Sequence, residues 1–141
     1  MTEPTPDSTP GTGPADDPEV IEFATRLFDL ARQGDAASLA SYVDAGVPAN
    51  LTNDRGDTLL MLAAYHAHAA AVRALLDRGA DPDRANDRGQ TPLAGAVFKG
   101  EKEVVTALVD GGADPTAGAP SAVDTARMFA KTDLLALFGA Q

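Results

Sequence analysis

The sequence predicts an all-α protein in which helical hairpins stack side by side into a solenoid. Two observations support this fold class. A shift of 33 residues aligns positions 53–82 with positions 86–115, and 15 of the 30 aligned pairs are identical without a gap. Each copy contains two stretches with apolar residues at helical spacing, separated by a short turn. A repeat period between about 20 and 50 residues is typical of solenoids, so we expect one elongated core rather than a globule.

Weaker copies flank these two. A further upstream shift of 33 places Leu27 under Leu60 and Gly46 under Gly79, so a divergent first copy begins near Val20. Downstream, a shift of about 30 places Ser121 on Thr91. The predicted repeats are 19–50, 51–83, 84–116 and 117–141, the outer two being divergent caps. Residues 1–18 hold five of the ten prolines and four acidic but no basic residues, which predicts a disordered tail.

Local signals place the helices inside each copy. Thr91 is a suitable N-cap because its hydroxyl can accept a backbone N–H, and Pro92 fits the first helical position. Thr58 predicts the same start in the second copy. Gly79 and Gly112 suit the left-handed residue that ends a helix. Between copies, Asn-Asp-Arg-Gly predicts a tight turn, so each polar segment should project as a finger similar to a short β-hairpin.

The pattern Asn-Asp-Arg-Gly-x-Thr-x-Leu, followed about twenty residues later by Gly-Ala-Asp-Pro, resembles the ankyrin repeat. The likeness covers roughly residues 20–138 and is strongest in the second and third copies. Met61 and Ala94 depart from it, since they replace the histidine of the family's Thr-Pro-Leu-His. The resemblance implies about four repeats, with a rigid concave face of finger tips and first helices that binds another protein.

Composition narrows the possible partners. The chain carries a formal net charge of −10, which disfavours nucleic acid and anionic membranes. It contains no cysteine, so disulfides and thiolate chemistry are excluded and a reducing cytoplasm is expected. No segment has the length and hydropathy of a membrane span or a signal peptide. Frequent arginine and alanine with few lysines suggests a bacterial source.

No catalytic or cofactor motif is present, and we expect no enzyme activity and no cofactor. Glycine-rich phosphate loops, nucleophile elbows and His-Glu-x-x-His are all absent from the sequence. His66 and His68 would point about 200° apart on a continuous helix and could not share a metal ion. A turn at Ala67 would interrupt the helix and would allow the two imidazole rings to point toward the same place. An accessory protein that holds a metal ion or small ligand at Tyr65, His66 and His68 is therefore the alternative function.

The resemblance also assigns candidate partner-binding residues, one position at a time, because these positions match the variable contact sites of ankyrin repeats. Tyr65 and Phe98 lie 33 residues apart, so their rings should line up on neighbouring layers as anchors, unless they pack between helices. The candidate residues are Asp54, Arg55, Asp57, Tyr65 and His66 in the second copy, and Asp87, Arg88, Gln90, Phe98 and Lys99 in the third.

The last copy is rich in large apolar residues, namely Met128, Phe129, Leu134, Leu135, Leu137 and Phe138. A terminal repeat usually presents a polar outer face. We expect most of these side chains to turn inward against the third copy. The other possibility is a patch for self-association, so that a monomer is expected and a homodimer through the C-terminal repeat is the alternative.

Overall fold

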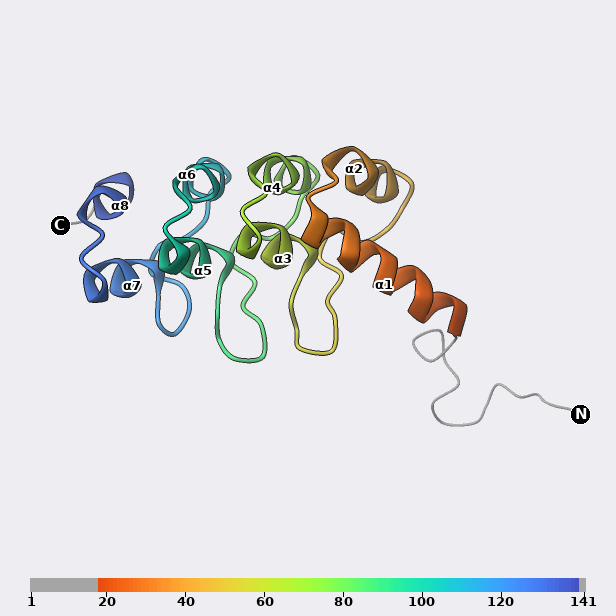
Figure 1. Ribbon diagram of the computed structural model, residues 1–141, viewed down its shortest axis with the longest axis horizontal. Helices are drawn as coiled ribbons and strands as arrows, with labels where there is room; N and C mark the ends of the chain where they lie inside the picture. The colour runs from red at the N-terminus through yellow and green to blue at the C-terminus, as the bar shows by residue number, and fades with distance from the viewer. Residues whose placement is uncertain (1–17, 140–141) are drawn as a thin grey trace, which may run out of the picture.

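The computed structural model describes residues 18–139. Of the predicted tail at residues 1–18, residues 1–17 lie outside this part of the chain, as do residues 140–141, whereas Pro18 begins the first helix. The described chain folds into eight helices arranged as four hairpins (Figure 1). The hairpins are α1 (Pro18–Gln33) with α2 (Ala36–Asp44), α3 (Leu59–Tyr65) with α4 (Ala69–Leu76), α5 (Pro92–Lys99) with α6 (Lys102–Asp110), and α7 (Ala122–Met128) with α8 (Thr132–Leu137).

The helices form two layers. The first helices of the hairpins (α1, α3, α5 and α7) lie in one row and the second helices in another, each touching the equivalent helix of the next hairpin (Figure 1). Loops project from the row of first helices and carry only isolated β-bridges, such as Thr52 with Thr58. The predicted all-α solenoid is therefore confirmed.

The core runs the length of the stack between the two layers. Equivalent residues of neighbouring repeats are fully buried, including Leu60 with Leu93 and Val72 with Val105. Ala63 and Ala96 are also fully buried, and their small side chains let adjacent first helices approach closely. One hairpin could not cover its own apolar stripe, so each repeat depends on its neighbours.

Hydroxyl caps begin the first helices where the sequence predicts them. The side-chain oxygen of Thr58 accepts the amide of Met61 at 3.0 Å, and that of Thr91 accepts the amide of Ala94 at 3.2 Å. Ser121 does the same in the last hairpin. Pro92 occupies the first turn of α5, and both Gly79 and Gly112 adopt positive φ, as expected.

The two ends of the stack differ from its middle. The first turns of α1 extend beyond the rest of the stack and leave Val20 and Ile21 exposed (Figure 1). In the last repeat Leu134 and Leu135 are buried and Phe138 is half-buried, but Met128, Phe129 and Leu137 are exposed. Three of the six residues are therefore exposed, so the expectation that most of them turn inward is wrong. Among residues 18–139 no helix is long and apolar enough to cross a membrane.

Candidate protein-binding face

The two fingers are built from the same turn. In the first, the side-chain oxygen of Asn53 accepts the amides of Arg55 and Asp57 at 2.9 and 3.0 Å. In the second, Asn86 accepts the amides of Arg88 and Gln90, both at 3.0 Å. These bonds satisfy the backbone of the turn locally, so the side chains at the tips remain available to solvent.

The fingers are joined to one another. The amide of Asp87 donates to the carbonyl of Arg55 at 3.0 Å, and Nδ2 of Asn86 donates to Oδ1 of Asp57 at 2.9 Å. Gly56 has a φ of +78°, and a Cβ there would lie 2.5 Å from Oδ1 of Asp87. Glycine is therefore required both by the turn and by the close approach of the next finger. This coupling holds the finger tips as one surface.

The aromatic side chains at the ends of α3 and α5 are exposed. Tyr65 is 48% exposed and Phe98 is 57% exposed, so neither ring belongs to the core. The two rings do not stack on each other. Tyr65 meets the ring of His66 edge-on at 5.4 Å, whereas Phe98 meets Phe129 of the last repeat at 5.3 Å.

Lys99 lies across the boundary between the second and third repeats. Its ammonium donates to the carbonyl of Tyr65 at 2.9 Å and sits 4.2 Å from the centre of the Tyr65 ring. The hydrogen bond satisfies a carbonyl that the end of α3 leaves without a helical partner. The cation over the ring also restrains the orientation of Tyr65, so Lys99 holds this aromatic side chain in a fixed position on the surface.

Two hollows lie side by side on this face. The apolar hollow has a volume of about 400 Å³, and its lining includes Tyr65, Phe98, Met128 and Phe129, with no charged residue. The polar hollow has a volume of about 530 Å³ and lies toward the fingers. Its lining includes Arg32, Asp54, Arg55, Asp57, Tyr65, His66, Asp87, Arg88 and Gln90. Met61, Tyr65 and Gln90 line both hollows. Nine of the ten predicted residues line one hollow or both, and the tenth, Lys99, contacts Tyr65 directly.

The charges of the polar hollow are only partly satisfied within the described chain. Arg32 pairs with Asp29 on α1 at 2.9 Å, and Asp57 accepts from Asn86. Arg55 and Arg88 are exposed on the finger tips and form no ion pair among residues 18–139. Guanidinium groups in this position can meet a carboxylate of a bound protein.

The two histidines lie in a turn rather than on one helix. α3 ends at Tyr65, Ala67 has a φ of +68°, and α4 begins after His68. His68 is half-buried, and its Nε2 lies 2.7 Å from the carbonyl of Arg32, to which the ring donates. Among residues 18–139, no three histidine, cysteine or acidic side chains gather as a metal site would require. The geometry therefore gives no support to the alternative metal site.

His66 faces the polar hollow. Partial burial lowers the pKa of its imidazole below the usual value, and the positive charges of Lys99, His68 and Arg32 lower it further. The ring is therefore mostly neutral near pH 7 and can both donate and accept a hydrogen bond.

The sequence reasoning missed part of the apolar hollow. Met128 and Phe129 line it and are 63% and 51% exposed, whereas the sequence analysis expects most of the large apolar residues of the last copy to turn inward. The signal was present, because the 30-residue shift of the fourth copy places Met128 on Phe98. Met61 also lines the hollow, at the place where the family usually has histidine.

Stacked helical hairpins with projecting fingers define a helical repeat solenoid. The family model for ankyrin repeats in three copies matches residues 27–119. An ankyrin repeat protein of Pseudomonas aeruginosa is 54% identical over 52 residues, which cover 37% of this chain and 30% of that relative's length. The crystal structure of the human ASB11 ankyrin repeat domain superposes with a TM-score of 0.69 at 26% identity, covering 79% of this chain and 52% of that one. The chain therefore belongs to the ankyrin repeat family.

Proposed function

We propose that the chain captures a partner protein on the face formed by its fingers and first helices. The observation that carries this proposal is the exposure of Tyr65 and Phe98 beside a hollow in a rigid surface. Large aromatic rings and arginine side chains contribute most of the binding energy in many protein interfaces. Here both kinds lie on one face, because the fingers carry Arg55 and Arg88 next to the aromatic rings.

The two hollows suggest a division of roles within the interface. The apolar hollow would take a bulky apolar side chain of the partner, and its burial supplies affinity. The polar hollow, with unpaired guanidinium groups and carboxylates, would fix the register of the partner. The function proposed is binding without catalysis, and a cytoplasmic location remains a prediction from composition.

Affinity capture from a native lysate tests this function. The variant with Tyr65→Ala and Phe98→Ala should lose the captured protein, because truncating a central aromatic anchor costs about 2 kcal/mol or more of binding free energy. Its helical content and melting temperature should stay close to those of the wild type, since both rings are exposed.

Leu137→Ala is the matched control, because Leu137 is an exposed apolar residue on α8 that lines neither hollow. It should retain the captured protein. Equal capture by the wild type and the double variant would overturn the proposed role of the aromatic face. So would equal loss in the control, because capture would then depend on general surface hydrophobicity.

A further inference from the structure

The apolar hollow lacks an occupant of its own chain. Its exposed rim is made by Tyr65, Phe98, Met128 and Phe129, which together with Leu137 are the large apolar residues left exposed outside α1 among residues 18–139. Its volume of about 400 Å³ holds a few aliphatic side chains but not a folded domain. An element that presents a short row of apolar side chains would fit it.

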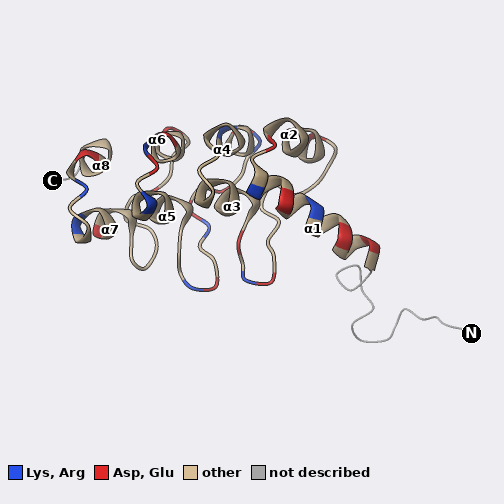
Figure 2. Ribbon diagram, viewed as in Figure 1, with Lys and Arg blue, Asp and Glu red and all other residues tan. Residues whose placement is uncertain are grey.

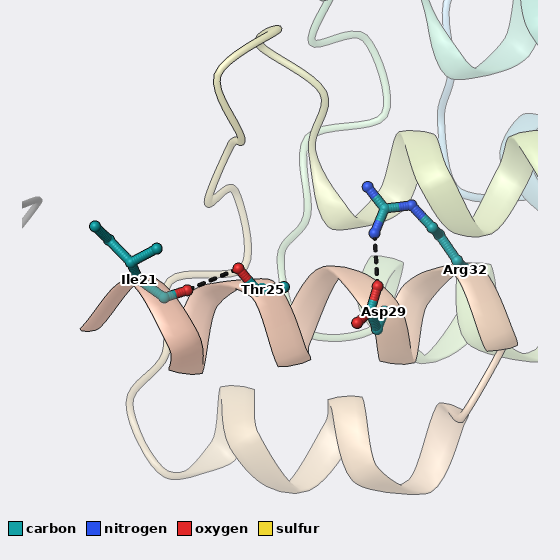
Figure 3. Close-up of polar contacts among 4 residues, drawn as sticks. All are labelled: Ile21, Thr25, Asp29 and Arg32. Carbon is teal, nitrogen blue, oxygen red and sulfur yellow. Dashed lines mark hydrogen bonds and ion pairs between the residues drawn. The ribbon is translucent and has the colours of Figure 1, made fainter. Parts of the chain in front are cut away.

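The first turns of α1 present such a row. Val20 and Ile21 are exposed, whereas Phe23 is 37% exposed and meets the ring of Tyr42 edge-on at 5.4 Å. The same helix buries Leu27, Phe28 and Ala31 further along. Ile21 lies in the first turn of the helix, and the Thr25 hydroxyl donates to its carbonyl at 2.8 Å (Figure 3). This segment is regular helix with an uncovered apolar surface, which suits insertion into a groove.

Two acidic residues flank the exposed start of α1, and two lysines lie beside the hollow. Glu19 and Glu22 flank the exposed residues of α1, and no basic residue precedes Arg26 in the helix. At the hollow, Lys99 follows Phe98, and Lys131 lies two residues beyond Phe129. Figure 2 shows the acidic start of α1 at one end of the stack and basic residues at the ends of α5 and α7. Neither lysine forms an ion pair among residues 18–139.

The end of α1 cannot reach the hollow of its own chain. α1 packs on α2 and α3 at the first end of the stack, whereas Met128 and Phe129 belong to the last repeat (Figure 1). A contact between the two features therefore needs two molecules. Because it joins different surfaces of the two copies, it is a head-to-tail contact.

We propose that the first turns of α1 of one copy insert into the apolar hollow of a second copy. Val20 and Ile21 enter the hollow, while Glu19 and Glu22 approach Lys99 and Lys131. The contact is small, so association is expected only at high protein concentration, with a dissociation constant of roughly 10 µM to 1 mM. This proposal does not rest on the proposed partner protein, because it concerns the isolated chain.

Sedimentation equilibrium of the purified full chain tests the proposal. The weight-average mass of the wild type should rise above the monomer mass with concentration, and the rise should weaken with added salt. Ile21→Asp removes the inserted end, and Met128→Asp blocks the hollow, so each variant alone should stay monomeric. Leu137→Asp, a control at an exposed apolar site outside the contact, should associate like the wild type. Circular dichroism checks that every variant keeps its helices.

Mixing the two defective variants gives the decisive measurement. The Met128→Asp copy retains an intact α1 end, and the Ile21→Asp copy retains an intact hollow. An equal mixture should therefore form one-to-one pairs and stop there, because the remaining surfaces are blocked. A wild type that stays monomeric at about 1 mM, a mixture that stays monomeric, or association that survives in either single variant would each overturn the proposal.

Discussion

Single side chains at the end of a first helix or in the turn that follows it link one repeat to the next. His68 donates to the carbonyl of Arg32 at 2.7 Å, and Lys99 donates to the carbonyl of Tyr65 at 2.9 Å. Both carbonyls lie in the last turn of the preceding first helix, where no helical amide can reach them. The sequence indicates Lys99 as a partner contact, but the structure shows that its ammonium is engaged within the chain. The residue therefore orients Tyr65 on the candidate face.

His66 should make stability depend on pH. Its pKa is lowered in the folded protein by partial burial and by nearby positive charge, whereas the unfolded chain has a value of about 6.5. Below about pH 6.5 the unfolded state binds more protons, so the free energy of unfolding falls as pH decreases through this window. We expect this fall to be smaller in His66→Gln. Urea unfolding at several pH values between about 7.5 and 5 measures it. Equal slopes in wild type and variant would contradict the expectation.

At the scale of elements, α3, α5 and α7 each begin with a hydroxyl cap, and the fingers at residues 53–57 and 86–90 each close on an asparagine. These signals are local, because a cap joins residues three apart and the turn joins residues two and four apart. Local hydrogen bonds of this kind follow from residue type and spacing, so the starts of α3, α5 and α7 could be predicted. The α7 start shows that Ser121 replaces threonine in this role.

Removing one cap should destabilise the domain measurably. Thr91→Val keeps the shape of the buried side chain but removes the oxygen that accepts the amide of Ala94. We expect a loss of about 1 kcal/mol in the free energy of unfolding, from the amide left without a partner. Thr91→Ser keeps the oxygen and should lose less. Chemical denaturation compares the two, and a loss in Thr91→Val no greater than that in Thr91→Ser would contradict a stabilising role of the cap.

At the scale of the whole molecule, stability comes from contacts between neighbouring repeats. α3 touches α1 and α5, and α5 touches α3 and α7, while the end repeats have a neighbour on one side only. A defect in the middle therefore removes contacts on both sides. Such a stack behaves approximately as a row of units coupled to their nearest neighbours.

A substitution that leaves a cavity in a central repeat should accordingly lower the free energy of unfolding strongly. Leu93 on α5 is 1% exposed, and Leu93→Ala should lower the free energy of unfolding by about 2–5 kcal/mol. Leu137→Ala, at the exposed end of the stack, should change it by less than about 0.5 kcal/mol. Thermal and urea unfolding measure both variants. A loss at Leu93 no greater than that at Leu137 would mean that the central interface contributes little.

The sequence by itself determined the repeat period, the caps and turns of the middle repeats and the all-α solenoid, because these depend on hydrogen bonds and apolar spacing within about one repeat. It also placed the candidate residues on fingers and first helices. Only the tertiary structure decided that Tyr65 and Phe98 are exposed, that Lys99 bonds to Tyr65, and that Met128 and Phe129 complete the apolar hollow. Those facts depend on how one repeat packs against the next, and no single segment of the sequence specifies that packing.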